Sequence, residues 1–135
     1  MRATLTIAIV LGALALDRLA LSTSPGARFL TPSPEGTAQV FVTSVAAHRP
    51  EQARDRLTPA VREQWSPARL RDLDRAWRDR DGDYRMAGGD ASGTDDRVEL
   101  RAHFKTARRG VVERHFVLER DADTALWKIA RIGDD

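Results

Sequence analysis

The chain of 135 residues contains no cysteine. It therefore has no disulfide bond, no thiolate zinc site, no cysteine nucleophile and no lipid attached through a cysteine. A chain of this length is expected to be one domain with an N-terminal appendage, because domains usually have about 100–200 residues. Its share of hydrophobic residues, 41%, is enough for one modest core without such staples.

Lysine is also scarce, and the basic residues are interspersed with acidic ones. Lysine occurs only at Lys105 and Lys128, so arginine supplies most of the 22 basic side chains, against 20 acidic ones. A chain in which 31% of the residues are charged and the signs alternate is expected to have a solvated, mixed surface. Because a nucleic-acid footprint should be a basic face without interleaved acids, we expect no nucleic-acid partner.

Long apolar runs are missing except at the N-terminus, where one extends from Ala3 to Leu16. As a helix this run is about 21 Å long, which is shorter than a hydrocarbon core of about 30 Å but matches the apolar region of a signal peptide. Extension to Leu21 gives about 28 Å, enough to span. We predict that residues 1–21 are an uncleaved signal anchor or, as the alternative, a cleaved signal peptide. Arg2 and the terminal amine favour the cytoplasmic side, so the rest of the chain would lie across the membrane.

Prolines and serines follow this segment. Residues 22–34 contain Ser-Pro-Gly, Thr-Pro and Ser-Pro, which is typical of an extended, semi-stiff linker. The folded domain is then expected over residues 35–135.

The first half of this domain is predicted to be helical. Helices are expected over residues 35–47, 50–57, 60–65 and 68–80. The first has an apolar stripe at Val40, Phe41 and Val45, and it ends at His48-Arg49-Pro50 because the residue before a proline avoids helical geometry. The last two begin with Thr58-Pro59 and Ser66-Pro67, in which the hydroxyl residue is the N-cap and the proline takes the first helical position.

In the last of these helices Leu70, Leu73 and Trp77 recur at helical spacing and are expected to face a sheet. Asp74 and Arg78 form an i, i+4 pair. The charged residues are predicted to form a solvated face: Arg69, Arg71, Asp72, Asp74, Arg75, Arg78 and Asp79. After a turn at Asp81-Gly82, we expect a short strand over residues 83–86 and a polar, glycine-rich loop over 88–96.

From Arg97 onward the hydrophobic period becomes two, which predicts consecutive strands over 97–106, 111–120 and 126–132. In the first, the apolar face comprises Val98, Leu100, Ala102 and Phe104. In the second, Val112, Phe116 and Leu118 lie on one face, and Glu113, His115, Val117 and Glu119 on the other. In the last, Trp127 and Ile129 lie on one face, and Leu126, Lys128, Ala130 and Ile132 on the other.

Two registers of the first two strands would align their apolar faces. One pairs Leu100 with Phe116 and places His103 opposite Glu113. The other pairs Leu100 with Leu118 and places His103 opposite His115. The residues alone do not decide between them.

Few side chains suggest chemistry. His103 and His115, with Glu99 or Glu113, could hold zinc, but they read more simply as the solvent face of a hairpin. Tyr84 with Asp83 or Asp90 could transfer a proton, although packing is the simpler role for it.

His48 is interpreted as a helix-end residue. No serine has a nucleophile-elbow setting, and the glycine-rich loop has no lysine at phosphate-loop spacing. We therefore assign no catalytic, cofactor-binding or metal-binding residue and expect no cofactor. The residues predicted to line an apolar pocket are Phe41, Trp65, Trp77, Tyr84 and Phe104.

Helices followed by a meander that ends in Trp127-Lys128-Ile129 resemble the nuclear transport factor 2-like (cystatin-like) α+β cone, in the form of bacterial membrane-attached or secreted domains. The opening helix over 38–47, the break at His48-Arg49-Pro50 and Leu57-Thr58-Pro59 fit this pattern. The resemblance covers roughly residues 35–133 and implies helices packed on a curved antiparallel sheet. The catalytic Asp, His and Tyr patterns of that fold's enzymes are not recognisable.

These observations predict a membrane-anchored, single-pass protein of the bacterial envelope, with its C-terminal domain outside the cytoplasm, or a secreted or periplasmic one after cleavage. We expect this domain to bind another envelope protein without chemistry of its own. The alternatives are a carrier of a small apolar ligand and, further off, an enzyme using Tyr84 with Asp90 or His103 with His115. The sequence does not predict the oligomeric state.

Overall fold

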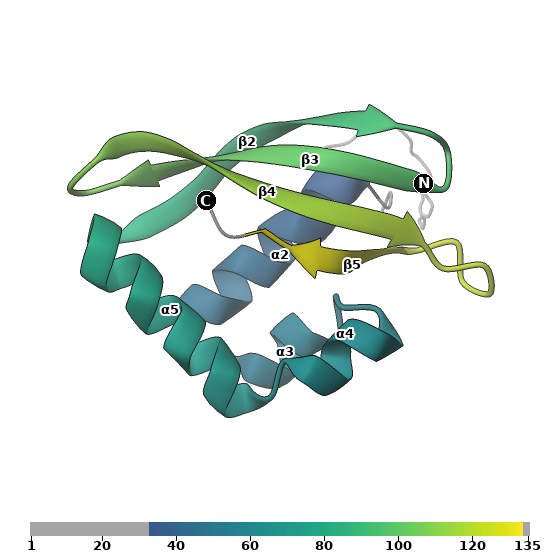
Figure 1. The fold of residues 1–135 in the computed structure, drawn as a ribbon, viewed down its shortest axis with the longest axis horizontal. Helices are drawn as coiled ribbons and strands as arrows, with labels where there is room; N and C mark the ends of the chain where they lie inside the picture. Colours follow the sequence, from purple (N-terminus) through teal and green to yellow (C-terminus); the bar gives the residue numbers. More distant parts are fainter. Residues whose placement is uncertain (1–32, 134–135) are drawn as a thin grey trace, which may run out of the picture. The chain divides into compact units, whose positions relative to one another are not determined.

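A computed structural model describes residues 33–133, in which helices precede strands (Figure 1). The helices are α2 (Pro34–Ala46), α3 (Pro50–Arg54), α4 (Pro59–Gln64) and α5 (Pro67–Asp81). The strands are β2 (Tyr84–Gly93), β3 (Arg97–Thr106), β4 (Gly110–Arg120) and β5 (Trp127–Ile132). The predicted α+β class is confirmed for this part of the chain.

The segment predicted to be a signal anchor or signal peptide, residues 1–21, and nearly all of the linker at 22–34 lie outside the described residues. Within residues 33–133, no helix has both the length and the apolar character needed to cross a membrane. The described residues, 33–133, belong to one compact unit, which is considered by itself below.

Each helix begins with a proline, as the sequence predicts for α4 and α5. The hydroxyl oxygen of Thr58 accepts from the amide of Val61 at 3.4 Å, and that of Ser66 accepts from the amide of Arg69 at 3.1 Å. Ser33 caps α2 in the same way. Gly82, with φ of 78°, ends α5 in a conformation that favours glycine. Local sequence therefore sets where these helices start and where α5 stops.

The strands form one antiparallel sheet in the order β2-β3-β4-β5. Leu100 lies opposite Phe116 and His103 opposite Glu113, so the first of the two predicted registers is the observed one. Thr106 pairs with Gly110 across a three-residue turn, and Gly110 has φ of 69°. Three-residue hairpin loops need such a left-handed residue at their end, so Gly110 favours the short turn and thereby this register.

The prediction of a short strand at 83–86 followed by a loop at 88–96 is wrong, because β2 continues to Gly93. A β-bulge between Met86 and Gly88 shifts the register, and glycines then hide the period-two pattern. At Gly89, a Cβ atom would lie 3.0 Å from the carbonyl oxygen of Arg101. The glycine thus permits the close approach of β3.

A second β-bulge, where β4 pairs with β5, changes which residues of β5 share a face. Leu118 pairs with Ile129, but Val117 pairs with Arg131 and Phe116 with Ile132. The extra residue turns Ile132 onto the face of Trp127 and Ile129, where it packs against the core. The prediction that Ile132 shares a face with Lys128 and Ala130 is therefore wrong.

All four described helices lie on one side of the sheet (Figure 1). The core forms between them, with Trp77 of α5 meeting Tyr84 and Phe104 edge-on at centroid distances of 5.2 and 5.3 Å. The other side of the sheet, called the outer face below, carries the charged residues of β3: Arg97, Glu99, Arg101, His103 and Lys105. Val117, also on this side, is the exception, since it is buried.

Candidate functional site

The buried stripe of α5 contains two carboxylates. Leu70, Asp74, Trp77 and Asp81 are all buried, at the spacing i, i+4, i+7 and i+11 of one helix face. The prediction that Asp74 belongs to a solvated face is wrong. Its position four residues after Leu70 and three before Trp77, on the same face of the helix, is the signal that would have placed it inside. Buried carboxylates require partners, and both have them.

Asp74 connects three separate elements. Its carboxylate accepts hydrogen bonds from the Tyr84 hydroxyl at 2.6 Å, from Nε of Arg78 at 3.0 Å, and pairs with Nε2 of His48 at 3.0 Å. Arg78 also donates to the carbonyl of Ala46 at 3.2 Å and to Asp83 at 2.8 Å. The ion pair of Asp74 and Arg78 predicted from the sequence is thus confirmed. It belongs to a network that holds α5 to the end of α2 and to the start of β2.

This network determines the protonation of its members. Burial favours the neutral form of Asp74, but the hydrogen bonds from Tyr84, His48 and Arg78 outweigh it, so the pKa of Asp74 lies below its usual value. Burial and the hydrogen bond to Asp74 raise the pKa of Tyr84 far above its usual value. Tyr84 is therefore a neutral donor, and its partner is Asp74, not Asp83 or Asp90 as the sequence suggested.

His48 is the exposed end of the network. It lies just beyond the end of α2, its side chain is 63% exposed, and its φ is 59°, in the left-handed region. The prediction that it is a helix-end residue agrees with this position, but its bond to Asp74 was not foreseen. Its imidazole and the Tyr84 hydroxyl bind different oxygens of the one Asp74 carboxylate, so the Tyr84 candidate of the sequence analysis and His48 share a partner.

Asp81, the second carboxylate, pairs with Arg114 of β4, and both side chains are buried. Nη1 of Arg109 lies 2.9 Å from the other carboxylate oxygen. The Arg114 guanidinium lies over the rings of Trp77 and Phe104, at 4.8 and 5.0 Å from their centroids. Sequence reasoning missed Arg114, although strict alternation between Val112 and Phe116 places it on the inner face.

The five residues predicted to line a pocket are only partly brought together. Trp77, Tyr84 and Phe104 contact one another in the core, and Phe41 meets Phe116 edge-on at 6.2 Å. Trp65 is partly buried elsewhere, beneath the guanidinium of Arg69 at 4.0 Å.

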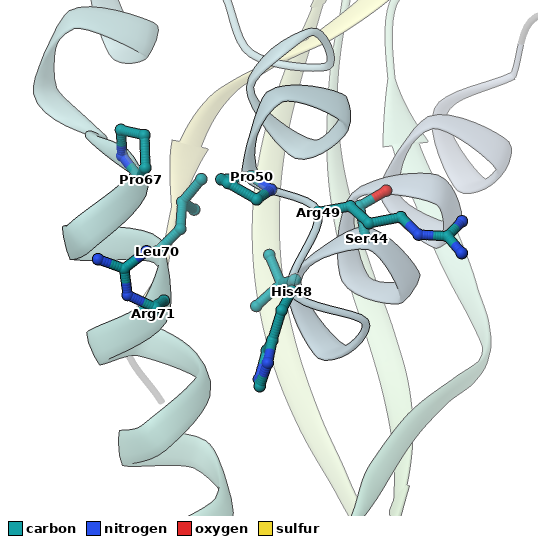
Figure 2. A pocket seen from close by; sticks show the side chains of 8 residues that line it. Ser44, His48, Arg49, Pro50, Pro67, Leu70 and Arg71 are labelled. Atoms are coloured by element: carbon teal, nitrogen blue, oxygen red, sulfur yellow. The ribbon is translucent and has the colours of Figure 1, made fainter.

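A small pocket opens instead between the start of α5 and the turn from α2 to α3 (Figure 2). Its lining residues are Ser44, Val45, His48, Arg49, Pro50, Pro67, Leu70 and Arg71. Figure 2 shows Pro50, Pro67 and Leu70 close together, while the side chain of Arg49 extends away from them. Its volume of about 10 Å³ accommodates roughly one water molecule. This pocket is far smaller than the several hundred Å³ of a typical ligand site.

On the outer face the structure brings the two histidines near carboxylates. Nε2 of His103 lies 3.8 Å from Glu113 and 3.7 Å from Asp90, and Nε2 of His115 lies 3.6 Å from Glu113. Within residues 33–133, however, no three His, Cys, Asp or Glu side chains are grouped so that they could hold a metal ion. These contacts, with the ion pairs of Arg97 and Glu119 and of Arg101 and Glu113, form rows of charge across β2, β3 and β4.

No protein-family model matches this chain, and no curated protein matches it. A solved structure is similar to it: the solution structure of a SEC-C motif containing protein from Rhodopseudomonas palustris. The two share 15% sequence identity and a TM-score of 0.54, over 76% of this chain and 79% of that one. At this identity the similarity shows the fold alone.

This neighbour overturns the resemblance to the nuclear transport factor 2-like, cystatin-like cone. The resemblance was based on helices followed by a meander and on a closing Trp-Lys-Ile strand. Both features reflect how layers pack and which residues are buried, and unrelated α+β folds share them. The description as a single-pass membrane protein finds no support in the described residues, which contain no helix able to span a membrane. The predicted anchor, residues 1–21, lies outside them.

Proposed function

We propose that this domain is a protein-binding module with no chemistry of its own, and that it presents the outer face of its sheet to a partner. The observation that carries the proposal is the one-sided packing of α2, α3, α4 and α5 (Figure 1). Packing on one side leaves the side chains of three adjacent strands accessible on a rigid frame. Binding residues are most precisely held when they stand on such strands.

The helix side supports the same proposal. On this side the aromatic rings pack against one another, and the carboxylate oxygens of Asp74 and Asp81 accept hydrogen bonds from residues of other elements. These groups therefore hold the fold together. On the outer face the ion pairs are exposed; Arg101 and Glu113, for example, are 58% and 43% exposed. Exposed pairs contribute only about 0–1 kcal/mol, so a partner can replace them at little cost. A partner with charges of both signs is the one that this face suits.

The proposed location is outside the bacterial cytoplasm, because residues 1–21 are predicted to direct export. A reporter enzyme that is active only outside the cytoplasm, fused after Asp135, should be active. Replacement of Leu11 and Leu14 by arginine interrupts the apolar run. Export should then fail, and the reporter activity should be lost. An active reporter in that variant would refute this location.

Site-specific photo-crosslinking in intact cells tests the binding function. A photoreactive residue is placed in the full chain at Arg101 or Glu119 on the outer face, or at Arg75 on the exposed side of α5. We expect a discrete adduct of one size from the two outer positions and little from position 75. Equal adducts from all three positions, or none from any, would overturn the proposal.

A further inference from the structure

The two edge strands of the sheet differ in their backbone hydrogen bonds to other segments. At β5, the segment between α3 and α4 covers the edge: the amide of Ile129 donates to the carbonyl of Arg56 at 2.7 Å, and the amide of Thr58 donates to the carbonyl of Ile129 at 3.0 Å. At the other edge, β2 pairs with β3 alone among the described residues. Figure 1 shows β5 facing the short helices and β2 at the opposite edge.

The register shows which backbone groups of β2 point away from the sheet. In an antiparallel pair, residues alternate between directing both N–H and C=O at the neighbouring strand and directing both away. The amide of Thr94 donates to the carbonyl of Arg97 at 2.9 Å, so Thr94 faces β3. No register shift occurs from Gly88 to Gly93. The residues that also face β3 are therefore Gly88, Asp90 and Ser92, and those that point away are Gly89, Ala91 and Gly93.

We propose that this edge of β2 binds an extended segment of a partner protein, which adds a strand to the sheet. The inference rests on the proposed protein-binding function and names its site. A row of backbone donors and acceptors is matched by another polypeptide strand. The side chains here are small, since residues 87–93 consist of alanine, glycine, serine and one aspartate, so a second backbone can approach without obstruction.

The charge on the edge indicates the chemistry of that segment. Asp90 stands on the outer face of β2 with its side chain 65% exposed. A residue paired with Asp90 points to the same face, where opposite charges stabilise a cross-strand pair. The residues on either side of it point toward the helices, beside Gly89 and Ala91. The segment is therefore an alternating one, with a basic residue between two small or apolar residues.

Amide hydrogen exchange of the full chain alone tests whether the edge is open. The amides of Gly89, Ala91 and Gly93 should exchange at least about tenfold faster than those of Gly88, Asp90 and Ser92, because exchange follows the opening of hydrogen bonds. Protection of the first set at every concentration would mean that residues 1–32 fill the edge. Protection that grows with concentration would mean that a second copy fills it. Either result would overturn the proposal.

Proline substitution then tests the partner. Ala91→Pro removes an amide that points away from β3, so the pairing of β2 with β3 is retained, whereas Ala91→Ser keeps the amide and is the matched control. With a photoreactive residue at Ser92 in intact cells, the adduct should fall at least about tenfold in Ala91→Pro and persist in Ala91→Ser. Asp90→Lys should also weaken it. An adduct unchanged in Ala91→Pro would refute the edge site alone, while the absence of adducts from positions 92, 101 and 119 would refute the binding function itself.

Discussion

The two faces of the sheet carry the same kinds of charged residue in opposite settings. On the helix side, Asp74, Asp81 and Arg114 are buried, and each carboxylate is contacted by at least two donors. On the outer face, Arg101 and Glu113 form an ion pair at 3.9 Å in which both side chains are exposed. Breaking a buried pair leaves a charge without solvent, whereas breaking an exposed pair returns both groups to water. We therefore expect the buried charges of the helix side to stabilise the fold, and we propose that the exposed charges of the outer face bind a partner.

The largest effect is expected from Asp81→Asn. Loss of this carboxylate removes the ion pair that Asp81 makes with the buried Arg114 guanidinium, which lies over the rings of Trp77 and Phe104. Breaking a buried pair in this way costs about 3–5 kcal/mol, measured as the free energy of unfolding of the full chain in urea. The control is Asp83→Asn, two residues away, where the side chain is 92% exposed and the expected change is below about 0.5 kcal/mol. Equal effects in the two variants would contradict the contrast between buried and exposed charge.

Tyr84→Phe is expected to have an intermediate effect. The ring remains in contact with Trp77 and Phe104, and only the donor to Asp74 is removed. Hydrogen bonds to charged groups contribute about 1.5–3 kcal/mol, so the free energy of unfolding should fall by that amount. A change below about 0.5 kcal/mol would mean that Asp74 does not depend on this hydroxyl.

The pH dependence of stability should follow from Asp74. Its folded pKa lies below the value of 3.8 expected for the unfolded chain. The stability it contributes is then fully present above that value and is lost as the pH falls through the folded pKa. The difference in urea midpoint between the natural chain and Asp74→Asn should therefore shrink as the pH falls from 5 to 3. A difference that grows on acidification would show that the folded pKa is raised instead.

Local signals in the sequence predicted much of this fold, and tertiary pairings account for what they missed. Thr58-Pro59 and Ser66-Pro67 determine their own helix starts because cap and proline act within one turn. Strand alternation likewise identified β3 and β4. The bulge that turns Ile132 inward adds one residue to β5. Every later residue of that strand therefore lies on the face opposite to the one that strict alternation predicts.

The candidate site was harder to predict than the fold. A charged residue is normally solvated, so Asp74 was assigned to the surface although its spacing from Leu70 and Trp77 is that of the buried stripe. Its partner Arg78 on the same helix was predicted, but the other two lie outside α5, ten residues away at Tyr84 and 26 away at His48. A periodic pattern predicts which face of its helix a residue occupies. It does not predict which residue of another element will contact that face.

The smallest effect is expected on the outer face, from Glu113→Gln. This change removes the charge that Arg101, His103 and His115 share, each at 3.6–3.9 Å and each in solvent. Because exposed pairs contribute about 0–1 kcal/mol, the free energy of unfolding should change by less than about 0.5 kcal/mol, while the adduct formed from position 101 should weaken. A loss of stability as large as that of Asp81→Asn would mean that the outer face holds the fold together too. Its charges would then not be available to a partner, and the division of roles between the two faces would be lost.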